Sequence, residues 1–504
     1  MTTPSTEGHG VIVDGVVDRA RDGARSLRAL TPDERVAHYP ALRKAILDRQ
    51  EEIISLVARQ THKARSDILM SEIFGALDAI AWCENNAAKA LADEKVPTPL
   101  ALMGKKSRIW YEPRGVVFII SPWNYPFFQA IVPTVQALAA GNAVVYKPSE
   151  WTPLAGLIES LLESAAIAPH WVQIVYGDGS IGAQIIEQRP DQIMFTGSTR
   201  TGRAILKQAA EHLIPVELEL GGKDAMIVFD DVQIPRTAAG AAFGALTALG
   251  QSCTSVERLY VQEGIHDAFV AELVDQVRTL KQESGDGRDN DLGSMTTPFQ
   301  VEIVARHVAD AKQRGATFHT GGDWDGVDPA IPPMVITDLP DDALMATEET
   351  FGPVIPVMRF STEAEAIARA NDSAYALTAS VWSKDADRAE RVARALRCGG
   401  VSINNVMATE ATQALPFGGV GESGMGRYKG IHGLRSFSNL KSVIIDKDGD
   451  KLEANWYPYT ERKYALFTDM MRALFTDSPV KLAKFGVLGT KLESYAQKAT
   501  RRTR

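Results

Sequence analysis

Residues 115–126 read GVVFIISPWNYP, a β-branched run that ends in a turn with two prolines. Similar runs follow at 143–146, 171–176 and 192–195, and each ends in glycine, proline or small polar residues. The stretches between these runs have helical spacing. This alternation predicts a parallel sheet that is buried on both faces. In open sheets of this kind, ligands bind at the carboxyl ends of the strands.

A second block of the same alternation begins at about residue 225. Its apolar runs lie at 225–229, 258–261, 354–359, 379–382 and 400–404. The sequence therefore predicts an α/β fold with two domains. Residues 15–95 have the periodicity of helices, and residues 107–111 alternate in the manner of an exposed strand. The Ala- and Gly-rich stretch 238–250 is predicted to be a buried helix.

The composition excludes several classes of protein. The 504 residues are 45% hydrophobic and carry a net charge of -9, which does not favour nucleic-acid binding. The three cysteines, Cys83, Cys253 and Cys398, are too few and too far apart for a disulfide framework or a zinc site. No apolar run reaches the ~18 residues of a spanning helix, and no signal peptide is found. These features predict a cytoplasmic protein without a metal site.

The last segment, 451–504, differs from the rest of the chain. It has 11 Lys and Arg against 5 Asp and Glu, a balance of +6, and eight aromatic residues. Two contacts fit such a tail. It is expected to pack on a second subunit, and the alternative is weak contact with an anionic membrane surface, which basic and aromatic side chains favour.

Three residues are candidates for catalytic roles. Cys253 lies in GQSCT (250–254), where small neighbours leave room for a carbonyl carbon, although a lone cysteine is more often a small buried hydrophobe. Glu219 lies among leucines at a strand end, where lost hydration raises the pKa of a carboxylate toward that of a general base, unless an ion pair holds it. Asn124 lies between two prolines, which suits a pre-organised oxyanion donor as well as ordinary turn chemistry.

Two further stretches have the character of a nucleotide site. Lys147 and Glu150, in KPSE at a strand end, offer one cation and one carboxylate to two ribose hydroxyls. Residues 197–202, GSTRTG, form a glycine-bounded turn that brings a helix N-terminus near a diphosphate. The chain has no convincing GxGxxG or Walker A sequence.

In this combination and order, the stretches resemble the aldehyde dehydrogenase superfamily. Glu219 and Cys253 are 34 residues apart, a gap similar to that between the family's base and nucleophile. The matching motifs are PWNYP (122–126), GNAVVYKPSE (141–150), FTGSTRTG (195–202), LELGGK (218–223), GQSCT (250–254), EETFGPV (348–354) and PFGGVGESGMG (416–426).

The resemblance implies a mechanism and a domain plan. Cys253 is expected to attack an aldehyde as the thiolate, Asn124 and the Cys253 N–H to hold the oxyanion, and Glu219 to activate water against the thioester. The fold is expected to comprise two Rossmann-like α/β domains and a small β oligomerisation extension. The expected segments are 1–95 and 114–221 for NAD(P) binding, 222–436 for catalysis, 96–113 and 437–450 for oligomerisation strands, and 451–504 for the C-terminal extension.

The resemblance also places the cofactor and the substrate. NAD is the expected cofactor because Glu150 should repel a 2′-phosphate, although relatives with the same KPSE accept NADP too. The expected cofactor residues are Ile120, Pro122, Trp123, Lys147, Glu150, Gly197, Ser198, Gly202, Leu220, Glu349 and Phe351. The expected substrate pocket is lined by Tyr125, Thr247, Ala411 and Phe417. Two of these four are small and one is polar, which predicts a tunnel for medium- or long-chain aliphatic or aromatic aldehydes.

The residues alone are also compatible with other functions. The alternatives are a semialdehyde dehydrogenase and a coenzyme A-acylating enzyme, which does not need Glu219 as a base. A non-enzymatic protein of this fold would be expected to have lost Cys253, Glu219 or Asn124. A metal-dependent alcohol dehydrogenase would need clustered Cys and His ligands. The short head and long tail resemble the dimeric branch of the superfamily, so a homodimer is predicted.

Overall fold

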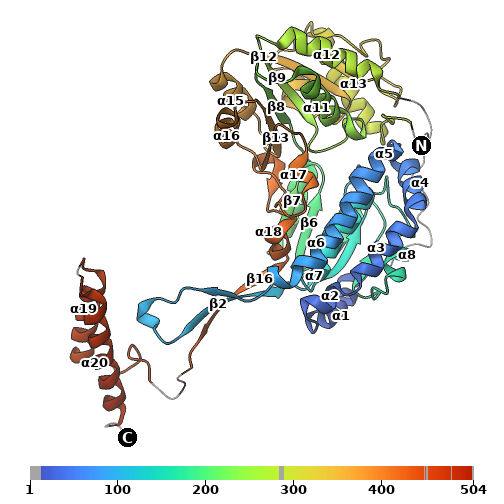
Figure 1. Ribbon diagram of the computed structural model, residues 1–504. Helices are drawn as coiled ribbons and strands as arrows, with labels where there is room; N and C mark the ends of the chain where they lie inside the picture. Colours follow the sequence, from blue (N-terminus) through green and yellow to red (C-terminus); the bar gives the residue numbers. More distant parts are fainter. Residues whose placement is uncertain (1–12, 283–288, 448, 450–451, 478, 502–504) are drawn as a thin grey trace. The chain divides into compact units, whose positions relative to one another are not determined.

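The computed structural model describes residues 13–282, 289–447, 449, 452–477 and 479–501. The chain divides into a larger unit, Met1–Ala92 with Trp110–Lys441, and a smaller unit, Asp93–Ile109 with Ser442–Arg504 (Figure 1). Parts of the predicted segments 1–95, 437–450 and 451–504 fall on residues 1–12, 448, 450–451, 478 and 502–504, which lie outside the described residues.

A six-stranded sheet forms the first half of the larger unit. Its order is β15-β7-β6-β3-β4-β5, and all neighbours are parallel except β15 and β7. The central strand β3 is buried on both faces, which explains its continuous apolar run. The strands are β3 (Val116–Ile120), β4 (Ala143–Lys147), β5 (Val172–Ile174), β6 (Gln192–Thr196), β7 (Val216–Glu219) and β15 (Gly424–Met425).

Helices pack on this sheet and share one core with it. The helix α7, which follows the PWNYP turn, is buried along its whole length. Its first N–H groups, those of Phe127 and Phe128, donate to the Glu72 carboxylate, which also pairs with Lys63 at 2.6 Å. The helices are α1 (Val16–Arg28), α2 (Pro32–Val36), α3 (Tyr39–Asp48), α4 (Gln50–Thr61), α5 (Arg65–Asp67), the π-helix η1 (Ile68–Phe74), α6 (Gly75–Ala90), α7 (Pro126–Ala139), α8 (Leu157–Ser164), α9 (Gly179–Glu187), α10 (Thr199–Glu211) and α18 (Gly430–Ser436).

A seven-stranded sheet forms the second half of the larger unit, in the order β10-β11-β12-β9-β8-β13-β14. Only β10 runs antiparallel to its neighbour. This arrangement confirms the predicted class of two Rossmann-like α/β domains. The strands are β8 (Asp224–Val228), β9 (Val256–Gln262), β10 (Thr317–Phe318), β11 (Met334–Thr337), β12 (Val354–Phe360), β13 (Thr378–Trp382) and β14 (Gly400–Ile403).

Two clusters of buried side chains cover the two faces of this sheet. Met226 and Val228 of β8 belong to one cluster, and Ala225 and Ile227 belong to the other, as the period of a strand requires. Helices α11 to α13 lie on one face and α15 and α16 on the other (Figure 1). The remaining elements are α11 (Ile234–Leu246), the 3₁₀ segment η3 (Thr247–Gly250), α12 (His266–Thr279), α13 (Pro298–Gln313), α14 (Leu344–Thr347), α15 (Glu363–Asn371), α16 (Ala386–Ala395), α17 (Ala408–Ala411) and η4 (Gly421–Ser423).

The predicted helix at 238–250 ends earlier than its apolar pattern indicates. Helix α11 stops at Leu246, and Ala248 and Leu249 have left-handed backbone angles, with φ of 52° and 56°. The Asp67 carboxylate accepts the Ala248 N–H at 2.6 Å and the Thr247 hydroxyl at 3.3 Å. A tertiary contact therefore ends the helix just before the cysteine loop.

The smaller unit contains a helical hairpin, formed by α19 (Glu461–Phe475) and α20 (Lys481–Arg501). A third sheet has the order β1-β2-β16, with β1 (Glu94–Val96), β2 (Lys106–Pro113) and β16 (Ser438–Ile445), and it includes the predicted strand at 107–111. The unit also contains the 3₁₀ turn η2 (Leu100–Leu102). Within the described ranges, no helix is both long and apolar enough to cross a membrane.

Candidate active site

Four strands of the six-stranded sheet end at one edge. Ile120 pairs with both Lys147 and Phe195, and Thr196 pairs with Glu219. The predicted cofactor residues that follow β3, β4 and β6 therefore lie next to one another. This edge is the place where parallel sheets bind nucleotides.

Lys147 is buried at the end of β4. Its Nζ lies 3.8 Å from Glu150 Oε2 and donates to the Pro148 carbonyl at 3.1 Å. Burial lowers the pKa of Lys147, and the neighbouring Glu150 partly offsets this effect. One cation and one carboxylate thus stand together at the sheet edge, as the KPSE motif predicts.

Helix α10 begins directly after β6. The Ser198 hydroxyl accepts the Thr201 N–H at 3.3 Å and caps the helix. Glycine is required on both sides of this turn. A Cβ at Gly197 would lie 2.5 Å from the Phe195 ring, and one at Gly202 would lie 2.7 Å from Leu220. The turn therefore keeps backbone N–H groups at a helix N-terminus next to the site, which suits a diphosphate.

Cys253 lies in the loop between η3 and β9 and is partly exposed. The buried Asn124 donates from Nδ2 to the Gln251 carbonyl at 2.9 Å. An amide group carries two N–H donors, so Asn124 can hold this loop with one and keep the other available. The structure thus brings the PWNYP turn against the Cys253 loop.

Glu219 is buried at the end of β7. Burial raises the pKa of its carboxyl group well above the usual value, and the charge of Glu410 adds to this, whereas a hydrogen bond with Cys253 opposes it. Among the described residues, no group donates a hydrogen bond to Glu219 Oε1. This oxygen is therefore available to accept a hydrogen bond from a water molecule or a substrate.

Residues 220–223 connect the two sheets, and two glycines there allow close approach. A Cβ at Gly222 would lie 2.2 Å from the Cys253 carbonyl oxygen, and one at Gly221 would lie 2.3 Å from the Glu349 carboxylate. The Gly222 N–H donates to Glu349 at 2.9 Å. Burial raises the pKa of Glu349 to about 8. The LELGGK motif therefore joins Glu219, the Cys253 loop and Glu349.

A buried ion pair holds the EETFGPV loop. Lys223 Nζ lies 2.6 Å from Glu257, whose carboxylate also accepts the N–H groups of Thr350 and Phe351. Phe351 has a left-handed backbone, with φ of 52°, and its ring packs edge-on against Trp123 at 5.5 Å. Glu257 was not among the predicted site residues. A glutamate in a buried strand nevertheless indicates a buried ion pair.

The four predicted substrate residues differ in burial and in their contacts. Tyr125 is buried beneath Lys63 Nζ, 3.8 Å from the ring centroid, and Thr247 is held by Asp67. Ala411 is exposed at the end of α17. Phe417 is buried against Tyr428, with 5.5 Å between ring centroids.

Two charged residues near Cys253, Glu410 and Lys429, were not among the predicted site residues. The Glu410 carboxylate accepts the Thr254 hydroxyl at 2.6 Å, and the Glu410 carbonyl accepts a hydrogen bond from the buried Lys429. Both residues lie outside the motifs that carry the resemblance. Lys429 lies three residues after PFGGVGESGMG. Its position in the sequence indicates a functional residue only when its burial is known.

The aldehyde dehydrogenase family model matches residues 6–443 of the chain. The chain belongs to the aldehyde dehydrogenase family. It is 41% identical over 466 residues to a 4,4'-diapolycopene aldehyde oxidase of Methylomonas, covering 92% of this chain and 87% of the relative. It is 35% identical to a betaine aldehyde dehydrogenase of Cereibacter sphaeroides, covering 84% of this chain and 87% of the relative.

Solved structures of the family agree with this aldehyde dehydrogenase in fold. A betaine aldehyde dehydrogenase of Staphylococcus aureus in complex with NAD+ matches with a TM-score of 0.82 and 32% identity, over 90% of this chain and 93% of that one. An NADP-dependent enzyme of E. coli matches with a TM-score of 0.82 and 30% identity, over 86% and 90%. The cofactor is therefore NAD(P).

The residues present fit this cofactor. The paired Lys147 and Glu150, the capped turn at Gly197 and Ser198, and Glu349 all lie along the sheet edge and the connection that leads to Cys253. The described part of the chain has no cluster of three or more His, Cys, Asp or Glu able to hold a metal ion.

Proposed function

We propose that this enzyme oxidises an aldehyde to a carboxylic acid through a thioester on Cys253. The observation that carries the proposal is that the turn with Asn124 and the strand end with Glu219 both pack against the Cys253 loop. The Cys253 sulfur attacks the carbonyl carbon and forms a thiohemiacetal. The Asn124 amide and the Cys253 N–H stabilise the oxyanion.

The cofactor residues serve the second part of the reaction. Lys147 and Glu150 would hold the adenosine ribose, Gly197 and Ser198 the diphosphate, and Glu349 the nicotinamide ribose. The bound cofactor would supply the hydride acceptor for oxidation of the thiohemiacetal to the thioester. Glu219 then takes a proton from water, which attacks the thioester and releases the acid.

Glu219 favours hydrolysis over transfer to coenzyme A. An acylating enzyme needs no water-activating carboxylate, whereas here the buried carboxyl group of Glu219 has a pKa raised by burial, and its electrostatic interaction with Cys253 opposes that shift. The test is product analysis with and without coenzyme A. Free acid in both cases supports the proposal, and formation of an acyl coenzyme A contradicts it.

We propose a medium- or long-chain aliphatic or aromatic aldehyde as the substrate. The relative at 41% identity is named for a diapolycopene aldehyde, whose polyene chain is apolar. The carboxylates of Asp67 and Glu410 lie beside the cysteine loop, at Thr247 and Thr254. Negative charge at these positions disfavours the anionic aldehyde of a semialdehyde dehydrogenase.

The aldehyde preference is directly measurable. We expect hexanal and benzaldehyde to have kcat/KM values about tenfold or more above acetaldehyde, because each buried CH₂ contributes ~0.8 kcal/mol. Succinate semialdehyde should be a poor substrate, and betaine aldehyde supplies the cationic comparison. NADH or NADPH formation over this panel is the measurement. A preference for acetaldehyde or succinate semialdehyde contradicts the proposed substrate class.

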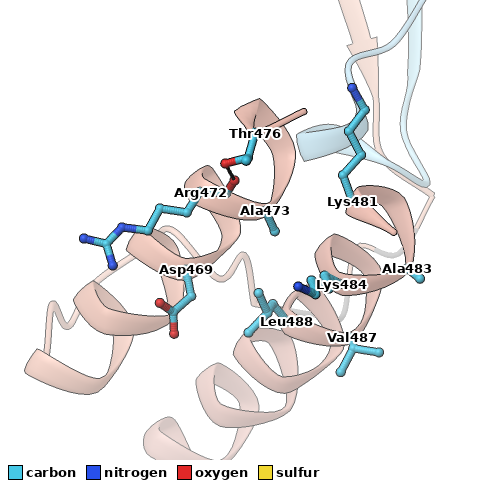
Figure 2. A pocket seen from close by; sticks show the side chains of 9 residues that line it. All are labelled: Asp469, Arg472, Ala473, Thr476, Lys481, Ala483, Lys484, Val487 and Leu488. Carbon is cyan, nitrogen blue, oxygen red and sulfur yellow. Dashed lines mark hydrogen bonds between the residues drawn. The ribbon is translucent and has the colours of Figure 1, made fainter. Parts of the chain in front are cut away.

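The helical hairpin exposes more large apolar side chains than it buries. Tyr464, Met471, Phe475, Leu482 and Val487 are exposed. A hollow of about 640 Å³ opens between α19 and α20. Figure 2 shows its lining residues, Asp469, Arg472, Ala473, Thr476, Lys481, Ala483, Lys484, Val487 and Leu488. The two helices leave these apolar side chains exposed to solvent. We therefore infer that a partner surface covers them.

We propose that this partner is a second copy of the chain, in a homodimer. The balance of +6 in residues 451–504 leaves -9 - 6 = -15 for the rest of the chain, so the tail and the body have complementary charge.

We expect deletion of residues 451–504 to convert the dimer to a monomer in light scattering. An unchanged mass would contradict the dimer role. Flotation with anionic vesicles tests the membrane alternative, which requires that only the full-length chain floats. The predicted cytoplasmic location stays a prediction.

A further inference from the structure

Lys429 is a buried lysine that the proposed mechanism does not use. The residue is 0% exposed, and its Nζ donates to the Glu410 carbonyl. The ammonium group lies over the rings of Phe417 and Tyr428, 4.8 and 5.5 Å from their centroids. A buried charge is costly unless its surroundings compensate it. Burial of the Lys429 ammonium therefore costs free energy, and the packing of the fold does not explain why a charge lies there.

The backbone of Lys429 adds a second cost. Its φ is +64°, in the left-handed region that a side chain with a Cβ rarely adopts. The Lys429 N–H donates to Gln136 of α7 at 3.3 Å, which holds this conformation. Strained backbone and a buried charge at one residue are typical of a functional position.

Glu410 links Lys429 to the cysteine loop, because its carbonyl accepts from Lys429 and its carboxylate accepts the Thr254 hydroxyl at 2.6 Å. Four groups from different elements act electrostatically on Lys429. They are Glu410 on α17, Glu219 at the end of β7, Cys253 in its loop and Asp78 on α6. Burial lowers the pKa of Lys429 to about 8, although these groups oppose the shift. The side chain is therefore a cation at neutral pH and loses its proton just above it.

Cys253 lies in strongly negative surroundings. Burial raises the pKa of its thiol well above the usual value, and the charges of Glu219, Glu410, Asp224 and Glu349 raise it further. Two other buried lysines of the site have carboxylate partners, Lys223 with Glu257 and Lys147 with Glu150. The ammonium of Lys429 instead donates to the Glu410 carbonyl, and the charge of Glu410 acts on it most strongly, followed by the charges of Glu219 and Cys253.

We propose that Lys429 is an electrostatic positioning residue, whose buried ammonium stabilises the Cys253 thiolate and the Glu219 carboxylate against the surrounding acidic groups. The proposal rests on Cys253 being the nucleophile. The thiol loses its proton to solvent, and Lys429 lowers the free energy of the resulting anion without changing its own bonds. Opposite charges within a protein interior interact strongly enough for this effect.

The test is the pH profile of Cys253 alkylation by iodoacetamide in the full-length enzyme, read by mass spectrometry at Cys253 between about pH 6 and pH 10. Iodoacetamide is neutral and reacts with the thiolate, so the rate reports the thiolate directly. In Lys429→Met we expect the profile to move up by about one pH unit, with about a tenfold slower reaction at pH 7.

Two variants keep the test decisive if Lys429→Met does not fold. Lys429→Arg stays charged throughout, so above pH 8 its Cys253 should react faster than that of the wild type, where Lys429 has lost its proton. Glu410→Gln removes a negative charge and should move the profile down. Lys63→Met removes a buried ammonium that pairs with Glu72, so it is the control for loss of a buried charge elsewhere and should leave the profile unchanged.

Each outcome has a clear meaning. A wild-type profile in Lys429→Met, or in Lys429→Arg above pH 8, overturns the role of Lys429. Failure of the proposed function looks different, because alkylation of Cys253 would then leave aldehyde oxidation intact. The two failures can thus be told apart in one preparation.

Discussion

Cys253→Ala should lower aldehyde oxidation by about 10⁴-fold or more in kcat with every aldehyde of the panel. Without the sulfur no thiohemiacetal forms, so no carbon is held in place to release hydride. The Asn124 amide and the Glu219 carboxylate then have no intermediate to act on, which is why the loss exceeds that of any single supporting group. The measurement is NADH formation at saturating cofactor.

Cys398→Ala is the matched control for this variant. Cys398 is also partly buried, but its thiol donates to the Gly400 carbonyl at 3.2 Å, at the start of β14. Its replacement should leave the rate near that of the wild type. Cofactor binding by Cys253→Ala checks that the fold is intact. Full activity in Cys253→Ala would refute the nucleophile assignment.

Glu219→Gln should separate the two half-reactions. We expect a burst of about one NADH per active site, because thioester formation does not need a base for water. Steady-state turnover should then fall by about 100- to 10,000-fold, because general base catalysis is lost. Rapid mixing measures the burst, and mass spectrometry detects the acyl group on Cys253. Unchanged steady-state turnover would argue against the role of Glu219.

The pH dependence of turnover gives an independent reading of Glu219. Burial and Glu410 raise the pKa of this carboxyl group, so more of it is protonated at neutral pH than for an exposed glutamate. A protonated carboxyl group cannot take a proton from water. Hydrolysis should therefore increase as pH rises through this pKa and decrease as pH falls, and Glu219→Gln should lose this dependence.

Local patterns were sufficient to predict most of the sheet framework. The run at 115–120 became β3, and the runs at 143–146 and 192–195 became β4 and β6, because strands buried on both faces consist of continuous apolar residues. The end of α11 could not be predicted in this way. Its apolar pattern continues to Gly250, and the helix ends because Asp67, about 180 residues away, takes the Ala248 N–H.

By itself, the sequence determined the two α/β domains, the family, and the candidate nucleophile, base and oxyanion donor. These features depend on short-range periodicity and on motifs in a fixed order, so they are visible without coordinates. Tertiary structure alone decided the electrostatics around Cys253. Glu410, Lys429, Asp224 and Glu349 come from distant parts of the chain, and their effect on the thiol depends on burial and proximity. Charge interactions weaken with distance and with exposure to solvent. The order of the residues gives neither the distances between these groups nor their exposure.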